Sequence, residues 1–496
     1  MTQTSYAVLE DRFRRLLALR DAEAILHWDL STMMPPGGAE SRGEQLAHLK
    51  AVQHGILAAP DMGELLAAAA DEDLNAGQDA NLREMTHQWR RSTALPEELV
   101  TALSRANSAC EMAWRSARPN NDFAAILPFL EDVLSLVREK AEILSGTLGL
   151  GLYDSLLDAY EPGGRAEEID TIFADLEAFL PGFLAEVLDR QAGQPPVIRP
   201  EGPFPVEKQR ELGIRFMKLL GFDFDHGRLD ISLHPFCGGT RDDVRITTRY
   251  DESDFTSSLM GVLHETGHAL YDMGLPEAWH GQPAGDARGM SLHESQSLLI
   301  EMQVCRSPEF LRFAAPIMAE AFGGSGPAWE PDNLVRLYSR VTPSLIRVDA
   351  DEVTYPAHVI LRYRLERALI EDRMKLRDLP GAFNDGLEKL LGVRPPDDRT
   401  GCLQDLHWYD GAWGYFPTYT LGAMTAAQIF DAAKKADPAI EPGIAKGDFK
   451  PLLAWLRVNV HAKGSLYSTR DQLIQATGRP LDAAVFETHL KERYLS

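Results

Sequence analysis

The segment GVLHETGHALYDMG, residues 261–274, carries two histidines four positions apart, with a glutamate directly after the first. If this segment is helical, His264 and His268 project from the same face, because residues four apart lie one above the other on a helix. Two imidazoles in that arrangement can bind one metal ion. Glu265 is offset by one position, so it can sit beside a metal-bound water without binding the metal itself. The segment therefore predicts a metal site with a general base next to it.

The flanking sequence supports a helix. Residues 249–274, RYDESDFTSSLMGVLHETGHALYDMG, have apolar residues at helical spacing over about five turns. Asp251 and Ser253 are the candidate caps, and Gly274 is expected to end the helix. Gly267 disfavours a helix by about 1 kcal/mol, which suggests that another element packs closely against it. The alternative is that the two histidines are simply exposed to solvent, or buried with their hydrogen bonds satisfied. The helical context argues against this alternative.

A catalytic zinc ion of this type takes three protein ligands and leaves one position for water. We expect the third ligand to be Glu294, in MSLHESQSLLIEMQVCRS (290–307), because a returning antiparallel helix would place its carboxylate opposite the histidines. His293 is the weaker choice, since it points about 100° away around that helix. Asp272 lies one turn beyond His268, too far along the axis to share the ion. It is expected to accept a hydrogen bond from a ligand imidazole, with an ordinary surface acid as the alternative.

Most of the remaining sequence has the apolar spacing and the residue types of helices. The clearest of these predicted helices cover residues 5–27, 40–58, 95–118, 122–148 and 166–190. Strands are expected only at RLDISLHPF (228–236) and DVRITTRYD (243–251), as one antiparallel hairpin with CGGTRD between them. The sequence therefore predicts a mostly helical protein with one small antiparallel sheet directly before the helix that carries the histidines.

The composition is that of an ordinary globular protein, with 44% hydrophobic and 25% charged residues. The formal net charge of −24 argues against a nucleic-acid partner and against an anionic membrane surface. No run of about 18 apolar residues predicts a transmembrane helix, and the N-terminus lacks the apolar stretch of a signal peptide. The four cysteines form no CxxC pair, which argues against thiolate zinc and a disulfide framework. A cytoplasmic location is therefore expected.

Several segments occur in order along the chain and resemble those of one metalloenzyme family. They are HWDLSTMMPPGGAESRGEQLA (27–47), HPF (234–236), DVRIT (243–247), HETGH (264–268), HESQS (293–297), IRVDAD (346–351) and GCLQDLHW (401–408) running into GYFPTYTLG (414–422). Over essentially its whole length, the chain resembles the zinc metallocarboxypeptidases typified by the thermostable Taq-type carboxypeptidase. The resemblance implies His264, His268 and Glu294 as metal ligands and Glu265 as general base, in agreement with the helix argument.

The resemblance also implies a fold and partners. The family has a helical architecture with a cleft, similar to neurolysin and angiotensin-converting enzyme, with the small sheet beside the HExxH helix. We expect one metallocarboxypeptidase domain over residues 1–496, in which an N-terminal helical part, about 1–200, covers the cleft and about 201–496 form the catalytic part. Peptide substrates and a homodimer are implied as partners. Zinc is the expected cofactor, and cobalt could replace it because both metals suit nitrogen and oxygen ligands.

Donors to the reacting carbonyl can be sought among the polar aromatic residues near the C-terminus. A developing oxyanion needs a neutral donor, and the candidates are His407, Tyr415 and Tyr419. The alternative for each is a structural role, as a core aromatic residue whose polar atom has a hydrogen-bond partner within the protein. His234, in the HPF segment, is a further candidate for contact with the substrate.

A carboxypeptidase must also bind a terminal carboxylate, and an arginine does so with two hydrogen bonds from one planar group. Arg347 is the first choice and Arg245 the second. For Arg347 the alternative is a structural ion pair, because acidic residues follow it closely, at Asp349, Asp351 and Glu352.

The expected activity is the release of single residues from the C-terminus of peptides. An extended peptide could pair with the edge of the predicted hairpin through main-chain bonds, which implies broad specificity. A terminal proline should be a poor substrate because it lacks the N–H that such pairing uses. A zinc oligopeptidase that cuts internally in short peptides and a non-catalytic helical metal-binding scaffold are the alternatives. Glu265 argues against the scaffold, because a structural zinc site needs no general base.

Overall fold

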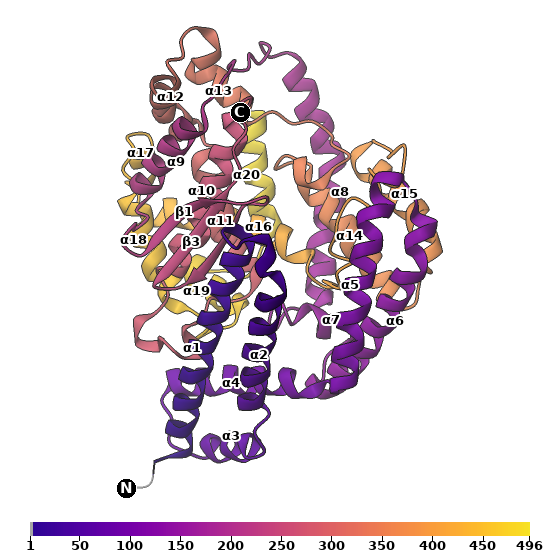
Figure 1. The fold of residues 1–496 in the computed structure, drawn as a ribbon. Coiled ribbons are helices and arrows are strands. Elements are labelled where there is room, and N and C mark those ends of the chain that lie inside the picture. The colour runs from indigo at the N-terminus through magenta and orange to yellow at the C-terminus, as the bar shows by residue number, and fades with distance from the viewer. Residues whose placement is uncertain (1–2) are drawn as a thin grey trace.

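The computed structural model describes residues 3–496, and nearly all of its regular structure is helical (Figure 1). The helices expected from the sequence are confirmed, and the first of them extends five residues beyond its predicted end. They are α1 (Ser5–Thr32), α2 (Ala39–Leu57), α5 (Glu97–Asn120), α6 (Phe123–Leu148) and α8 (Ala166–Ala192).

The remaining helices complete the chain and include one π-helix, η4 (Leu299–Cys305). None of the helices within residues 3–496 is long and apolar enough to cross a membrane. The other α-helices are α3 (Met62–Ala70), α4 (Ala76–Ala94), α7 (Leu152–Leu157), α9 (Val206–Leu220), α10 (Phe255–Asp272), α11 (Met290–Leu298), α12 (Pro308–Phe322), α13 (Pro331–Tyr338), α14 (Tyr355–Ile370), α15 (Leu379–Leu391), α16 (Pro417–Ala436), α17 (Ile440–Ile444), α18 (Lys450–Asn459), α19 (Thr469–Thr477) and α20 (Ala483–Leu495).

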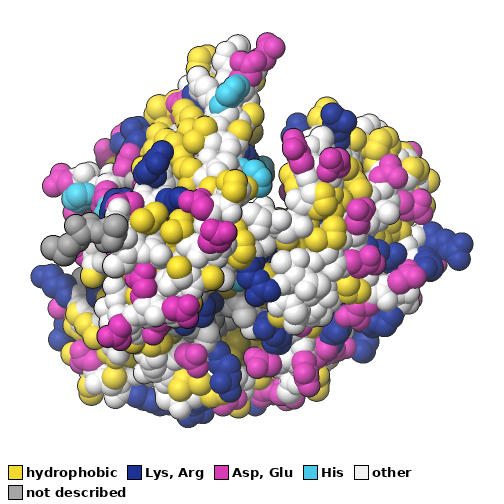
Figure 2. Space-filling view, turned by 90° about the horizontal axis from the view of Figure 1, so that it is seen from below, with side chains coloured by type: hydrophobic (Ala, Val, Ile, Leu, Met, Phe, Trp, Pro, Cys, Tyr) yellow, Lys and Arg dark blue, Asp and Glu magenta, His cyan; other side chains and the backbone are white. Residues whose placement is uncertain are grey.

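Most helices pack around two large hydrophobic cores and form two lobes, while α1 to α4 share a smaller core of their own (Figure 1). The first core is built mainly from α5 to α8, α14 and α15, and the second from α9 to α13 with α17 and α18. Helix α16 contributes to both, with Met424 in the first core and Ile429 in the second. It therefore joins the lobes, and a space-filling view shows a hollow between two masses of the molecule (Figure 2).

The sheet differs from the predicted hairpin. It has three strands, β1 (Gly227–Ile231), β2 (Phe236–Thr240) and β3 (Asp243–Thr248), in the order β1-β3-β2. Strands β2 and β3 are antiparallel, but β1 runs parallel to β3, so the sheet is mixed. The two predicted strand segments do pair, but the expected antiparallel hairpin of 228–236 with 243–251 is wrong. The reason lies in CGGT (237–240), part of the CGGTRD connection, which forms most of β2. Gly239 has a φ of +86° and lies so close to Asp243 that a side chain would meet its carbonyl oxygen, so this glycine allows a strand there.

One face of the sheet packs on the helix with the two histidines. Val244 and Ile246 of β3 and Leu229 of β1 form a small core with Val262 and Ala269 of α10. Strand β2 lies at one edge of the sheet, paired on one side only with β3. The sheet and α10, which are neighbours in the sequence, are therefore also in direct contact in the structure.

Candidate active site

Helix α10 begins at Phe255 and ends at Asp272, which gives the predicted five turns. Its cap is Asp254, whose carboxylate accepts the backbone N–H of Thr256. The predicted caps, Asp251 and Ser253, are therefore wrong, because Asp251 instead binds Ser253 in the turn before the helix.

Within residues 3–496, one group of three or more potential metal-binding side chains comes together: His264, His268 and Glu294. One donor atom from each lies within 4.8 Å of the others. Oε2 of Glu294 is 3.4 Å from Nε2 of His268 and 3.9 Å from Nε2 of His264. A tetrahedral ion with bonds of about 2.0–2.1 Å separates its ligand atoms by about 3.4 Å. Two imidazoles and one carboxylate at this spacing fit a single metal ion, as predicted.

The helix that carries Glu294 packs tightly against α10, as Gly267 suggested. A side chain at Gly267 would collide with the backbone of α11, where its Cβ would meet the carbonyl oxygen of Gln296 and lie 2.6 Å from the Cα of Ser297. On the other side, a Cβ at Gly422 of α16 would lie 2.9 Å from the Cβ of Glu294. Two glycines therefore let three helices approach closely enough to bring the carboxylate to the histidines.

This close approach predicts opposite effects of alanine at two glycines of α10. Gly267→Ala should lower the free energy of unfolding by about 1–3 kcal/mol, the usual cost of overpacking. Gly261→Ala is the matched control, because a Cβ there meets nothing within 4 Å. It should raise the free energy of unfolding by about 0.4–1 kcal/mol. Denaturant unfolding of the metal-free protein measures both, and equal effects would contradict tight packing at Gly267.

The electrostatics of the donor group favour a cation. Burial disfavours the charged form of His264, but Glu294 and then a hydrogen bond to Glu301 raise its pKa to about 10. Burial raises the pKa of Glu294, yet the histidines beside it, His264 first, lower it to about 2. His268 is instead kept neutral, because burial lowers its pKa to about 4. A carboxylate that stays ionised beside a neutral imidazole is the state that binds a metal.

His264 is oriented by a residue that the sequence reasoning missed. Its Nδ1 lies 2.9 Å from Oε2 of Glu301, which leaves Nε2 for the metal-binding group. Glu301 is itself fixed by Arg306, whose Nη2 donates to Oε1 at 2.7 Å. A carboxylate behind a ligand histidine is a common feature of metal sites. A signal was present in the sequence, since Glu301 follows Glu294 by seven positions, two turns of a helix.

His268 is oriented differently from the prediction. Its Nδ1 lies 2.6 Å from Nδ1 of His293, and Nε2 of His293 lies 3.1 Å from Asp272. Asp272 therefore reaches the ligand only through His293, and its predicted direct contact with a ligand imidazole is wrong. Its distance along α10 explains this, because a second imidazole fills the gap of one helical turn. His293 does not belong to the donor group, in agreement with its ranking behind Glu294.

Glu265 is buried beside the donor group, on α10. Burial raises its pKa to about 7, and the charge of His264 opposes this rise. Strand β2 packs against α10, and the Cys237 thiol of β2 has a pKa raised by burial, then by the charge of Asp272 and then by that of Glu265. The thiol lies 4.0 Å from Oδ2 of Asp272. The edge strand therefore lies against the helix that carries Glu265, whose pKa of about 7 suits a general base.

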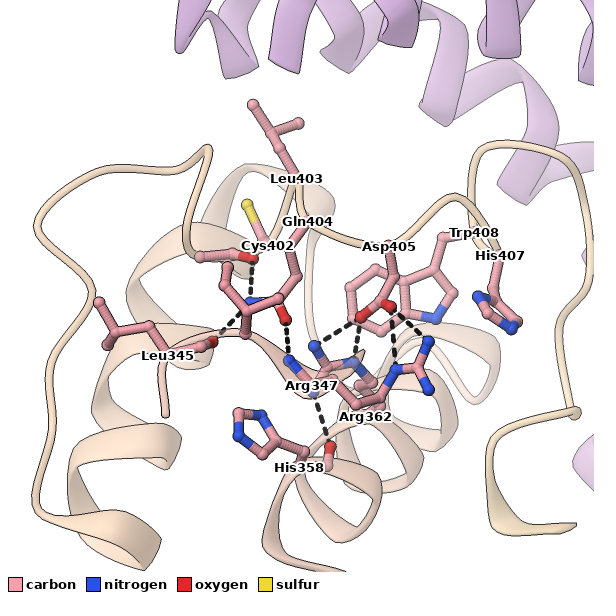
Figure 3. A network of polar contacts seen from close by, with 12 residues as sticks. Leu345, Arg347, His358, Arg362, Cys402, Leu403, Gln404, Asp405, His407 and Trp408 are labelled. Carbon is pink, nitrogen blue, oxygen red and sulfur yellow. Dashed lines mark hydrogen bonds and ion pairs between the residues drawn. The ribbon is translucent and has the colours of Figure 1, made fainter. Parts of the chain in front are cut away.

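Arg347 and a second arginine, Arg362, lie in a buried network around one aspartate, Asp405 (Figure 3). Nε of Arg347 donates to Oδ1 of Asp405 at 2.9 Å, and Nε of Arg362 donates to Oδ2 at 2.5 Å. One carboxylate thus faces two guanidinium groups. The histidines beside them are neutral, because burial lowers the pKa of His358 to about 3 and of His407 to about 4. Arg347 forms its ion pair with Asp405, and not with Asp349, Asp351 or Glu352, which were considered from the sequence.

The aromatic candidates gather between Arg347 and the metal-binding group. Nη1 of Arg347 donates to the Tyr355 hydroxyl at 2.7 Å, and its guanidinium centre lies 5.1 Å from the ring of Tyr419. Nε2 of His407 lies 3.2 Å from the Tyr419 hydroxyl, and the rings of Tyr415 and Tyr419 are 5.1 Å apart. Burial raises the pKa of Tyr355 to about 12 and raises the pKa values of Tyr415 and Tyr419 further. The negative charge of Glu294 contributes to all three rises. Tyr355 was not among the predicted residues.

Arg245 and His234 lie apart from this cluster. Arg245 forms an ion pair with Asp243 at 2.5 Å, and its guanidinium centre lies 4.5 Å from the ring of Trp28 in α1. His234 is exposed in the loop between β1 and β2. In the described part of the chain, neither forms a hydrogen bond or ion pair with the metal-binding group.

Comparisons with known proteins show the family of this chain. The family model described as carboxypeptidase Taq (M32) metallopeptidase matches residues 8–494. The chain is similar to thermostable carboxypeptidase 1 of Thermus thermophilus, with 39% identity over 99% of this chain and 98% of that protein. It is similar to carboxypeptidase 1 of Bacillus subtilis, with 34% identity over 98% and 97%.

Solved structures give the same result for the fold. The structure of metallocarboxypeptidase 1 from Trypanosoma cruzi matches with a TM-score of 0.98 and 41% identity over 100% of both chains. An M32 carboxypeptidase from Deinococcus radiodurans matches with a TM-score of 0.93 and 35% identity, over 99% of this chain and 98% of the other. With its His264, His268 and Glu294 group, the chain belongs to the carboxypeptidase Taq (M32) family of metallopeptidases and is a metallocarboxypeptidase.

Proposed function

We propose that the protein is a zinc enzyme that releases single residues from the C-terminus of peptides with broad specificity. The observation that carries this proposal is the surplus positive charge at Arg347, which contacts Tyr355 and Tyr419. Contacts with Asp405 and Tyr355 use at most three of the five N–H groups of Arg347. The remaining groups can bind a terminal carboxylate, and Asp405 cannot neutralise both arginines.

Zinc is the metal that this donor set favours. Two imidazoles and one carboxylate that leave a fourth position open are typical of catalytic zinc, and cobalt suits the same ligands. Bound there, zinc would act as a Lewis acid that activates water and polarises the scissile carbonyl.

Glu265 is the proposed general base. It accepts a proton from the attacking water and passes that proton to the nitrogen of the leaving residue. Its pKa of about 7 suits both steps, because the group can take up and release a proton near neutral pH.

The tyrosines and His407 are proposed to stabilise the oxyanion that develops on the scissile carbonyl. Tyr415 and Tyr419 stay protonated over the working pH range, since burial raises their pKa values, and each can therefore donate a hydrogen bond. His407 is neutral and can keep the Tyr419 hydroxyl in place across their 3.2 Å contact.

Strand β2 is proposed to bind the substrate backbone. An extended peptide that pairs with its free edge would be recognised by main-chain groups, so the protein should accept many side chains. A terminal proline has no N–H for such a contact and should resist cleavage.

Three further expectations from the sequence stay predictions. The N-terminal part, about residues 1–200, would cover the cleft, and the stacking of Arg245 on Trp28 of α1 supports a contact of this part with the sheet. The homodimer and the cytoplasmic location follow from the family resemblance and from the sparse cysteines, respectively.

A peptide digest followed by mass spectrometry tests the proposed function. Chelated protein reloaded with zinc should shorten a free peptide one residue at a time from its C-terminus and stop where proline becomes the terminal residue. Internal fragments appearing first would favour an oligopeptidase. A metal-replete protein that cleaves nothing would favour the non-catalytic scaffold.

A further inference from the structure

The helical segment that carries Glu294 changes its winding before it reaches Glu301. Helix α11 continues without a break into the π-helix η4, residues Leu299–Cys305. A π-turn holds one residue more than an α-turn, so the side chains within it point in other directions than they would in a continued α-helix. Glu301 is the third residue of η4. The orientation of Glu301 toward His264 therefore depends on the π-helical winding of this segment.

The C-terminal helix α20 binds the free carbonyl groups of η4. The last carbonyls of a helix have no partner within it. Here the guanidinium of Arg493 donates from Nη1 to the carbonyl of Met302 and from Nη2 to the carbonyl of Gln303, the latter at 3.1 Å. These two residues directly follow Glu301. A single side chain from the far end of the chain thus holds the backbone that positions Glu301.

Glu352 fixes Arg493 in this place. Its Oε2 accepts from Nη1 of Arg493 at 3.1 Å and from the Tyr494 hydroxyl at 3.0 Å. Its Oε1 lies 2.8 Å from Nε2 of His489 and accepts from Nε2 of Gln303 at 3.1 Å. The carboxylate is almost wholly buried and paired, which is the condition under which a buried charge is stable. The contact from Gln303 ties the same cluster directly to η4.

We propose that Arg493 is a positioning residue for the metal site: it stabilises the π-helical winding of η4, which orients Glu301 against His264 and thereby strengthens metal binding. The path is continuous, from Arg493 to the carbonyls of Met302 and Gln303, from there to Glu301, and on to the metal-binding His264. This role does not depend on which bond of a peptide is cut.

Zinc affinity, measured by competition with a chelator, tests this role. Glu301→Ala should weaken zinc binding by about 10- to 100-fold, the usual effect of losing an outer-shell partner. Arg493→Met should weaken it by about tenfold, the low end of that range, because it acts through Glu301. Arg493→Lys keeps a charged donor group and should lose less. Lys491→Met, on the exposed side of the same helix, is the matched control and should leave zinc affinity unchanged.

The double variant separates positioning from general stability. If Arg493 acts through Glu301, then Arg493→Met should cost nothing more in a Glu301→Ala background. Hydrogen exchange of residues 299–306 in the metal-free protein should also accelerate in Arg493→Met and stay unchanged in Lys491→Met.

Several outcomes would overturn the role of Arg493. They are an unchanged zinc affinity in folded Arg493→Met, a full further loss in the double variant, or unchanged exchange in residues 299–306. If Arg493→Met does not fold, Glu352→Gln decides, because it removes the ion pair with Arg493 but keeps the shape of the side chain. It should weaken zinc binding in the same direction, and wild-type affinity in that variant would equally contradict the role.

Discussion

Glu265→Gln should lower turnover by at least about 10²-fold, the usual contribution of a positioned proton-transfer group. The amide keeps the size of the carboxylate but cannot accept a proton from water. Glu265 lies one position off the face that carries His264 and His268, so metal binding should survive the change. Burial raises the pKa of the carboxyl to about 7, which means that the uncharged amide replaces a group already poised to be neutral. The fold should therefore survive as well.

The measurement is turnover of metal-replete protein on a free peptide, with metal content determined in the same samples. Glu252→Gln is the control, because this glutamate is exposed in the turn before α10. It should keep wild-type turnover. Near wild-type turnover in metal-replete Glu265→Gln would remove Glu265 from the mechanism.

Local sequence signals predicted the helices well. The expected helices at 40–58 and 122–148 differ from α2 and α6 by at most one residue at each end. Their boundaries are set by nearby residues, such as Asp122, whose side chain caps α6, and Gly149, which ends that helix in the left-handed conformation. Such contacts span a few positions, so they can be read from the chain alone.

The sheet was predicted less well because its pairing is not local. The parallel contact of β1 with β3 skips the strand between them in the sequence. Alternating β-branched residues indicate a strand, but they do not identify its neighbour. Gly238 and Gly239 also favour a turn by composition, and only the close contact of Gly239 with Asp243 makes glycine necessary within β2.

The residues of the candidate site also fall into those that local sequence signals predict and those that depend on the tertiary structure. His264 and His268 follow from helical spacing, and Glu294 follows from the antiparallel return that Gly267 makes room for. Glu301 was missed although its spacing from Glu294 is two α-helical turns, because it lies in a π-helix, and the sequence gives no clear sign of that winding. Tyr355 was missed because its place in the site depends on the ring of Tyr419, from a distant segment of the chain, as well as on Arg347, eight residues before it. Contacts of this kind require the tertiary structure.

Replacing the terminal carboxylate of a peptide by an amide should slow its cleavage by about 10- to 150-fold. The change removes a negative charge and one acceptor, and a charge-assisted hydrogen bond is worth about 1.5–3 kcal/mol. Arg347 is the proposed partner of that carboxylate, since Asp405 divides its charge between Arg347 and Arg362 (Figure 3). Arg347→Ala should therefore give a similar loss on free peptides and little further loss on amidated ones, because both changes break the same contact.

The comparison of four rates, wild type and Arg347→Ala on free and amidated peptides, measures this coupling. Arg347→Ala should fold, because Asp405 keeps its ion pair with Arg362 at 2.5 Å and is not left as an unpaired buried charge. Arg245→Ala is the control that separates the two candidate arginines. If Arg245→Ala removes the preference for free peptides and Arg347→Ala leaves it intact, the clamp lies at the sheet. Equal cleavage of free and amidated peptides by the wild type would contradict a carboxylate clamp altogether, since no partner of the terminal charge would then contribute to the rate.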